Sequence, residues 1–150
     1  MNHLSLADNI LISQDVAAQA ASANVQGTVL DMQGWDGCCY EFNLGAMGAG
    51  ATFQAAIFSS PNANMSGNAV VTGTYLGAPV NATFAAPIAN TSANNTFMID
   101  VYRPTNRYLQ DVAQPTGANV SFAVSALRYR RNGLLPPTQT AQSIVRVQVN

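Results

Sequence analysis

The chain contains no lysine, one glutamate and one histidine among its 150 residues. Charged side chains make up 9% of it, against about a quarter in an ordinary soluble domain. Catalysis near neutral pH usually requires clustered His, Cys, Asp, Glu or Lys side chains, so this composition favours a protein that is not an enzyme. A freely soluble monomer usually has a charged surface, whereas Asn, Gln, Ser, Thr, Ala and Gly must cover most of this one. Such a surface is typical of a protein that packs against neighbours in an assembly.

Residues that bind metals or cofactors are equally scarce. His3 is the only histidine, and alone it builds neither a catalytic triad nor a zinc site. Cys38 and Cys39 are adjacent, so in a regular strand their side chains point to opposite faces; we interpret them as a buried thiol and its neighbour in a reducing compartment. The glycine-rich run at 45–50 lies between two expected strands, which excludes a phosphate-binding loop. We expect no cofactor, no metal and no small-molecule substrate.

Signals for membranes and nucleic acids are not found either. No apolar run approaches the roughly eighteen residues of a membrane helix. Residues 1–6 contain no Lys or Arg, and the apolar run at 10–12 is too short for a signal peptide, so we expect cytoplasmic synthesis. The six arginines form no long basic run and accompany no aromatic RNA-binding signature, so a nucleic acid is not an expected partner.

The charges that are present divide unevenly along the chain. Residues 1–99 carry five acidic side chains and no arginine, whereas residues 100–150 carry all six arginines and two aspartates. One interpretation is that strands from both halves interleave, so that opposite charges pair within one fold. The other is a basic face that docks on an acidic partner. We favour the first interpretation.

Short apolar runs separated by turn residues predict an all-β fold. Phe97, Ile99 and Val101 alternate with the residues between them, as in a half-buried strand, and Asp36-Gly37 is a strong hairpin signal. We expect about eight strands, within 25–33, 38–44, 51–59, 68–75, 96–102, 107–113, 119–129 and 144–149, and 80–84 is a candidate for a further short edge strand. This spacing, without a repeat of fixed period, predicts a single domain with the architecture of a β-sandwich or barrel.

We place the β-domain at residues 24–133. Before it lies a lead segment, residues 1–23. Within that segment, 7–21 is rich in alanine and lacks Pro and Gly, which suits a short helix. An extended N-terminal arm is equally compatible with its periodicity, so both alternatives stay open.

Residues 134–150 follow as an extended C-terminal arm that includes the last strand. Leu134 and Leu135 precede two prolines, a combination too apolar to stay in solvent and unsuited to a central strand, so this part should run extended across a surface. The valine face of 144–149 needs a sheet to cover it. That sheet is either the chain's own or a neighbouring subunit's, reached by strand addition, and we favour the neighbour.

Two turns carry further residues that we expect at an interface. Trp35, the only tryptophan, lies at the predicted hairpin turn, where it either folds back on the domain or anchors a partner. Arg103 and Arg107 flank a turn closed by Pro104. At least one of these arginines should make a charge-assisted bond to a carboxylate or a backbone carbonyl, within the subunit or on a neighbour. The interface candidates are therefore Trp35, Arg103, Arg107, Leu134 and Leu135.

Three stretches resemble small head proteins that are encoded beside the major capsid gene of tailed bacteriophages. They are NVQGTVLDMQGWDG at 24–37, DVYRPTNRY at 100–108 and RYRRNGLLPPTQ at 128–139. The resemblance implies a jelly-roll-like capsid decoration, or cement, protein. It would be made in the cytoplasm of a bacterial host, bind the major capsid protein on the exterior of the virion, and contact further copies of itself as a homo-oligomer.

Two other functions remain open at this point. One is a different virion component, such as a head fibre, connector or tail subunit, with the same sandwich; a fibre would favour a glycine-rich repeat, which the chain does not have. The other is a carbohydrate-binding β-sandwich module. Such a module usually shows several exposed aromatic residues near carboxylates, and here only Trp35 beside Asp36 qualifies.

Overall fold

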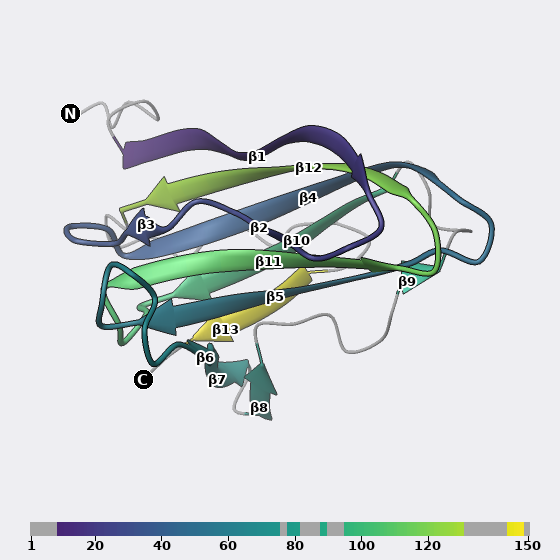
Figure 1. Cartoon of the computed structure of the whole chain (residues 1–150). Helices are drawn as coiled ribbons and strands as arrows, with labels where there is room; N and C mark the ends of the chain where they lie inside the picture. Colours follow the sequence, from purple (N-terminus) through teal and green to yellow (C-terminus); the bar gives the residue numbers. More distant parts are fainter. Residues whose placement is uncertain (1–8, 76–77, 82–87, 90–94, 131–143, 149–150) are drawn as a thin grey trace, which may run out of the picture.

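A computed structural model of the chain describes residues 9–75, 78–81, 88–89, 95–130 and 144–148 (Figure 1). These residues form two packed β-sheets and contain no helix long and apolar enough to cross a membrane. The first sheet has the spatial order β1 (Ile10–Ala21), β12 (Val120–Tyr129), β4 (Gly37–Met47), β10 (Thr96–Tyr102), β13 (Ile144–Gln148), β7 (Thr72–Tyr75) and β8 (Ala78–Asn81). The second has the order β2 (Val25–Gln26), β11 (Tyr108–Thr116), β5 (Thr52–Ser60) and β6 (Ala69–Val70); β3 (Leu30–Asp31) also pairs with β11, and β9 (Ile88–Ala89) with β5.

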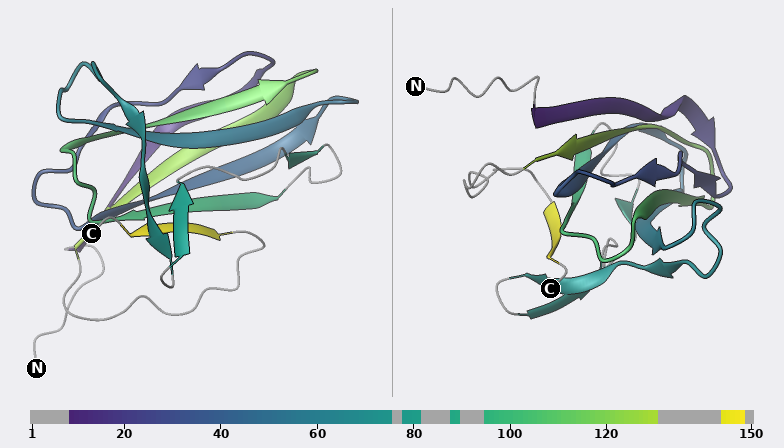
Figure 2. Two further views of the ribbon diagram at one scale, coloured as in Figure 1. Left: turned by 90° about the horizontal axis from the view of Figure 1, so that it is seen from below. Right: turned by 90° about the vertical axis from the view of Figure 1, so that its left-hand side faces the viewer.

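The all-β, jelly-roll-like sandwich expected from the sequence is confirmed. Neighbouring strands are antiparallel throughout, except that β10 and β13 are parallel. In the end-on view of Figure 2 (right), β1 lies at the top of the molecule, and β7 and β8 lie at the bottom. The first sheet therefore reaches from one side of the molecule to the other.

Alternating side chains of the central strands fill the space between the sheets. Along β12, Val120, Phe122, Val124 and Ala126 are buried, whereas the residues between them are half-buried. Rings from the two sheets meet in the middle: the centroid of Phe53, on β5, lies 5.3 Å from that of Phe122 and 6.2 Å from that of Phe42 on β4. Each buried large apolar side chain contributes about 1.5–3 kcal/mol, so this shared layer holds the sandwich together.

The lead segment is a strand rather than a helix. Residues 10–21 form β1, which pairs antiparallel with β12 from Ile10 opposite Tyr129 to Ala21 opposite Val120. Of the two alternatives for 7–21, the structure therefore has the extended one over its described part. Register shifts between residues 14 and 19 bend the strand, and its edge position leaves Leu11 and Ile12 exposed.

The predicted strand at 25–33 is interrupted. It divides into β2 and β3, and between them Gly27 lies against buried side chains, with its N–H donating to the Asp111 carbonyl oxygen at 3.0 Å. The predicted strand at 68–75 also divides, because the chain crosses from one sheet to the other at the buried Val71. Its first part, β6, pairs with β5, and its second part, β7, pairs with β8 and β13.

Two strands run further than the sequence predicted. β4 continues to Met47, into the glycine-rich run at 45–50, and β11 continues to Thr116, beyond the predicted end at residue 113. Pro115 is tolerated inside β11 because β2 does not reach this position, so no ladder partner on that side needs its missing N–H.

The last strand lies in the chain's own sheet. β13 pairs with β10 in parallel, from Met98 opposite Ile144 to Tyr102 opposite Gln148. The expectation that this strand is added to a neighbouring subunit is therefore wrong for residues 144–148. The physical reason is that β10 has one edge on β4 and would otherwise leave its other edge unpaired. Leu134 and Leu135 lie outside the described residues.

Candidate functional site

Four described arginines and three aromatic residues gather at one end of the sandwich. This arginine–aromatic end consists of Trp35, Tyr102, Arg103, Arg107, Tyr108, Arg128 and Arg130. Strand register explains the gathering, because β10 and β12 end where β4 begins: Tyr102 and Tyr129 both lie opposite Gly37. It is the left-hand end in Figure 1, where β11 also starts. The sequence predicted three of these residues as interface candidates, and the fold brings them together.

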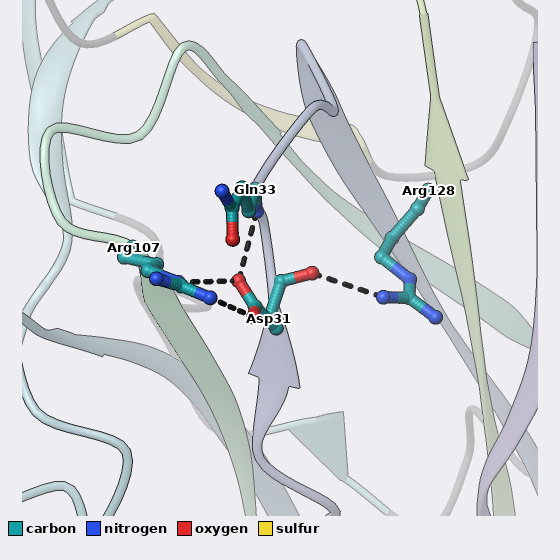
Figure 3. Close-up of polar contacts among 4 residues, drawn as sticks. All are labelled: Asp31, Gln33, Arg107 and Arg128. Carbon is teal, nitrogen blue, oxygen red and sulfur yellow. Dashed lines mark hydrogen bonds and ion pairs between the residues drawn. The ribbon is translucent and has the colours of Figure 1, made fainter.

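Arg107 is engaged within the fold. Its Nε and Nη2 donate to the two carboxylate oxygens of Asp31 at 2.9 and 2.6 Å, and the Gln33 backbone N–H donates to the same carboxylate at 2.9 Å (Figure 3). The Arg107 bond, followed by that from Gln33, lowers the pKa of Asp31 from 3.8 to about 2. The expected charge-assisted bond is thus confirmed, and it joins the acidic and basic halves of the chain. Both side chains are nearly half exposed, so the ion pair is a modest stabiliser.

Trp35 folds back on the domain. Its half-buried ring packs against the core, and the guanidinium carbons of Arg128 and Arg130 lie 5.5 and 5.0 Å from the ring centroid. Both arginines also hold the loop before β4, because Arg128 donates to the Asp31 carbonyl oxygen at 3.0 Å and Arg130 to that of Gly34 at 2.9 Å. These contacts make Trp35 part of the fold, which is one of the two alternatives predicted for it.

Arg103 differs from the other three arginines. It is exposed and has a φ of 55°, a left-handed conformation that a residue with a Cβ rarely adopts. Its backbone N–H donates to the Asp36 carbonyl oxygen at 2.7 Å, which explains how the bend is held. Within the described part of the chain, its guanidinium has only the Tyr102 ring as a partner, at 5.6 Å. Arg103 is therefore the cation of this end that is available to another molecule.

A second polar site lies on the side of the sandwich that β1 and the β2–β3 segment cover, and the sequence analysis missed it. Asp111, fully buried on the inner face of β11, and Asp15, on β1, approach each other across Gly27. A Cβ on Gly27 would meet Asp111 Oδ1 and, at 2.6 Å, Asp15 Oδ2. We call Asp15 and Asp111 the acid pair. The missed signal is that Asp111 occupies the inward position between Leu109 and Ala113.

Within the described residues, no cation compensates the charge of the acid pair. Burial, and then the hydrogen bond and the charge of Asp15, raise the pKa of Asp111 from 3.8 to about 9. Tyr40 and Cys38 of β4 are both buried, and this burial raises the pKa of each well above its usual value. The charges of Asp15 and Asp111 act on Tyr40 as well. The sheets therefore enclose a small group of titratable polar side chains.

Cys38 and Cys39 are the remaining residues that could take part in metal binding or redox chemistry. Cys38 is buried and Cys39 is half-buried, neither forms a disulfide, and they occupy successive positions on β4, as the alternation of a strand requires. Among the residues that the structure describes, no three His, Cys, Asp or Glu side chains gather as metal ligands would. The acid pair supplies two carboxyl groups and no third ligand among these residues.

Comparisons with known proteins leave the family open. No protein-family model matches the chain, and no curated protein matches it.

Proposed function

We propose that this chain is a non-enzymatic structural protein of a bacteriophage virion, which binds the outside of the capsid as a decoration protein. Its partners are the major capsid protein and further copies of itself. The sequence resemblance at 24–37, 100–108 and 128–139 supports this, as does a composition with 9% charged residues. A β-sandwich that bridges several subunits resists outward pressure through many modest contacts acting together, a task that needs shape and apolar area more than ionisable groups.

The observation that carries the proposal is Arg103. A left-handed backbone at an exposed arginine has an energetic cost, and such conformations cluster at functional sites. Its guanidinium has no carboxylate partner among the described residues, whereas Arg107 beside it is held by Asp31. An arginine presented in this way suits a carboxylate or a carbonyl oxygen on the surface of a neighbouring protein.

The alternative of a carbohydrate-binding module fits the structure less well. A sugar stacks on a free aromatic face, and Trp35 is packed against the core with two guanidiniums over its ring. The other virion locations, head fibre, connector or tail, share the chemistry of a protein-binding surface. They are therefore separated from a decoration role by the position of the chain in the particle.

The deciding experiment is a cryo-EM reconstruction of particles produced by the genome that encodes this chain. We expect to find this sandwich on the outer surface of the shell, with its arginine–aromatic end toward the major capsid protein. Density at the connector, tail or a fibre would replace it with the alternative virion role. Purified particles that do not contain the chain would overturn both.

Matched variants then test the docking end. Arg103→Ala should weaken binding to particles lacking the protein by about tenfold, the usual effect of losing one hydrogen bond to a charged group, and leave Tm unchanged. Arg103→Lys keeps the charge but not the planar fork, so it should recover part of the binding. Arg107→Ala is the control within the same turn. If it weakens binding as much as Arg103→Ala does, the assignment of Arg103 is wrong.

A further inference from the structure

The acid pair shows an arrangement that the proposed function does not use. Its two carboxyl groups come from different sheets, Asp15 from the edge strand β1 and Asp111 from β11. Because a single point, the Cβ position of Gly27, lies close to an oxygen of each, the two oxygens are near neighbours. One further residue, Thr28, connects Asp15 to the β2–β3 segment: its backbone N–H donates to Asp15 Oδ1 at 2.7 Å.

The remaining carboxyl oxygens of the acid pair have no donor among the described residues that meets hydrogen-bond geometry. Asp15 Oδ2 and both carboxyl oxygens of Asp111 are buried, and the described residues supply no N–H or O–H to any of them. The largest interaction left to them is the hydrogen bond between the two carboxyl groups themselves; the backbone N–H of Asp111 acts more weakly on its own carboxyl group and does not reach hydrogen-bond geometry. Two carboxylates cannot form that bond, since both only accept; one of them must carry a proton. Without the proton, two like charges would face each other in the core.

We propose that Asp15 and Asp111 share one proton, and that this proton fastens the edge strand β1 to the β2–β3 segment and the second sheet. Loss of the proton in mild alkali weakens the contact of β1 with the β2–β3 segment and the second sheet. The shared proton does not depend on whether the chain binds a capsid. The titratable groups that face the pair are Tyr40 and Cys38 on β4, and both are neutral at pH 7. Among the described residues, Asp15 is the only charged side chain that acts on Asp111.

The sign of the pH effect follows from proton uptake. The pKa of Asp111 is raised to about 9 in the folded chain, above the value near 4 of the unfolded chain, so folding takes up one proton between these two values. The stabilisation is fully present below about pH 4 and is lost as the pH rises toward 9. Between pH 5 and 8 the folding equilibrium constant should fall about tenfold per pH unit. This window lies below the titration of unfolded cysteine and tyrosine.

The test measures unfolding of the full chain in denaturant at pH 5, 6, 7 and 8. The wild type should show the tenfold fall per unit, and Asp111→Asn, whose amide donates without a proton, should remove most of it. Asp15→Asn is the second variant and should also flatten the dependence, which keeps the test decisive if one variant fails to fold. Asp31→Asn is the matched control and should retain the full fall. A flat wild-type profile would overturn the proposal.

Two direct measurements locate the effect. Infrared spectra at pH 7 should show the carbonyl stretch of one protonated carboxyl group in the wild type, lost in Asp111→Asn; its absence from the wild type would contradict the shared proton. Hydrogen exchange should accelerate in β1 and at residues 25–28 between pH 6 and 8, relative to β4 and after correction for intrinsic rates. Uniform acceleration would contradict a local fastening. A rise in Tm on adding Ca²⁺ at pH 8 would show that the pair binds a cation instead.

Discussion

Asp31 at the arginine–aromatic end and Asp111 in the acid pair are the same residue type with opposite pKa shifts. Asp31 is partly exposed, faces a guanidinium and accepts a backbone N–H, so its pKa falls to about 2. Asp111 is fully buried beside another carboxyl group, so its pKa rises to about 9. One carboxyl group is held by a charge and the other by a proton. Burial and the neighbouring group, rather than the residue type, decide whether the pKa of an aspartate in this β-sandwich is lowered or raised.

The largest expected effect comes from filling the space that the acid pair occupies. Gly27→Ala places a Cβ where Asp111 Oδ1 lies, so both carboxyl groups must move, and the free energy of unfolding should fall by about 3 kcal/mol. Gly45→Ala is the control, because the nearest atom to its Cβ would be Ser121 Cβ, at 3.3 Å. Denaturant unfolding of both variants measures the difference. Equal losses would mean that Gly27 is needed for its backbone and not for the acid pair.

The second effect lies at the other region. Trp35→Ala removes a half-buried ring from the core and from beneath two guanidiniums, and should cost about 2 kcal/mol in the free energy of unfolding. Trp35→Phe should recover more than half of that loss, because it keeps an aromatic face. Urea unfolding of the two variants measures this. A Trp35→Ala loss that is too small to measure would return Trp35 to the surface as a partner contact.

A smaller effect, of opposite sign, separates Arg103 from its neighbours. Arg103→Gly removes the cost of a left-handed Cβ-bearing residue and should raise the free energy of unfolding by about 1 kcal/mol. Arg103→Ala keeps that cost and should leave stability unchanged. Thermal unfolding of the two variants in parallel tests this. Destabilisation by both would place the Arg103 side chain in the fold and would weaken its assignment to docking.

The smallest effect concerns the exposed ion pair. The pKa of Asp31 is depressed in the folded chain, so its stabilisation is present above about pH 4 and is lost as the pH falls through 2. Asp31→Asn should therefore lower Tm by about 3 °C at most at pH 7 and by less at pH 2. Asp111→Asn should leave this loss of stability at low pH unchanged. If the loss of stability at low pH disappears in Asp111→Asn, the arginine–aromatic end and the acid pair are coupled.

The strands that the sequence predicted best have clear alternation. Phe97, Ile99 and Val101 placed β10 at 96–102, the bounds that the structure has, and the run around Val120 and Phe122 placed β12 to within one residue. The turn at Arg103 and Arg107, with its charge-assisted bond, was also predictable from local chemistry. These features depend on residues a few positions apart, and a period of two in side-chain burial is visible in the sequence itself.

The acid pair, the interruption at Gly27 and the pairing of β13 were decided by the tertiary structure. Asp15 and Asp111 lie on strands from different sheets, and only the packing of those sheets brings their carboxyl groups together. The sequence did contain two local signs, an isolated glycine in a predicted strand and a carboxyl group at an inward position, but neither names its partner. Local periodicity determines which face of a strand is buried. Which strand lies against that face depends on contacts distant in sequence, and so does the pKa of a carboxyl group placed there.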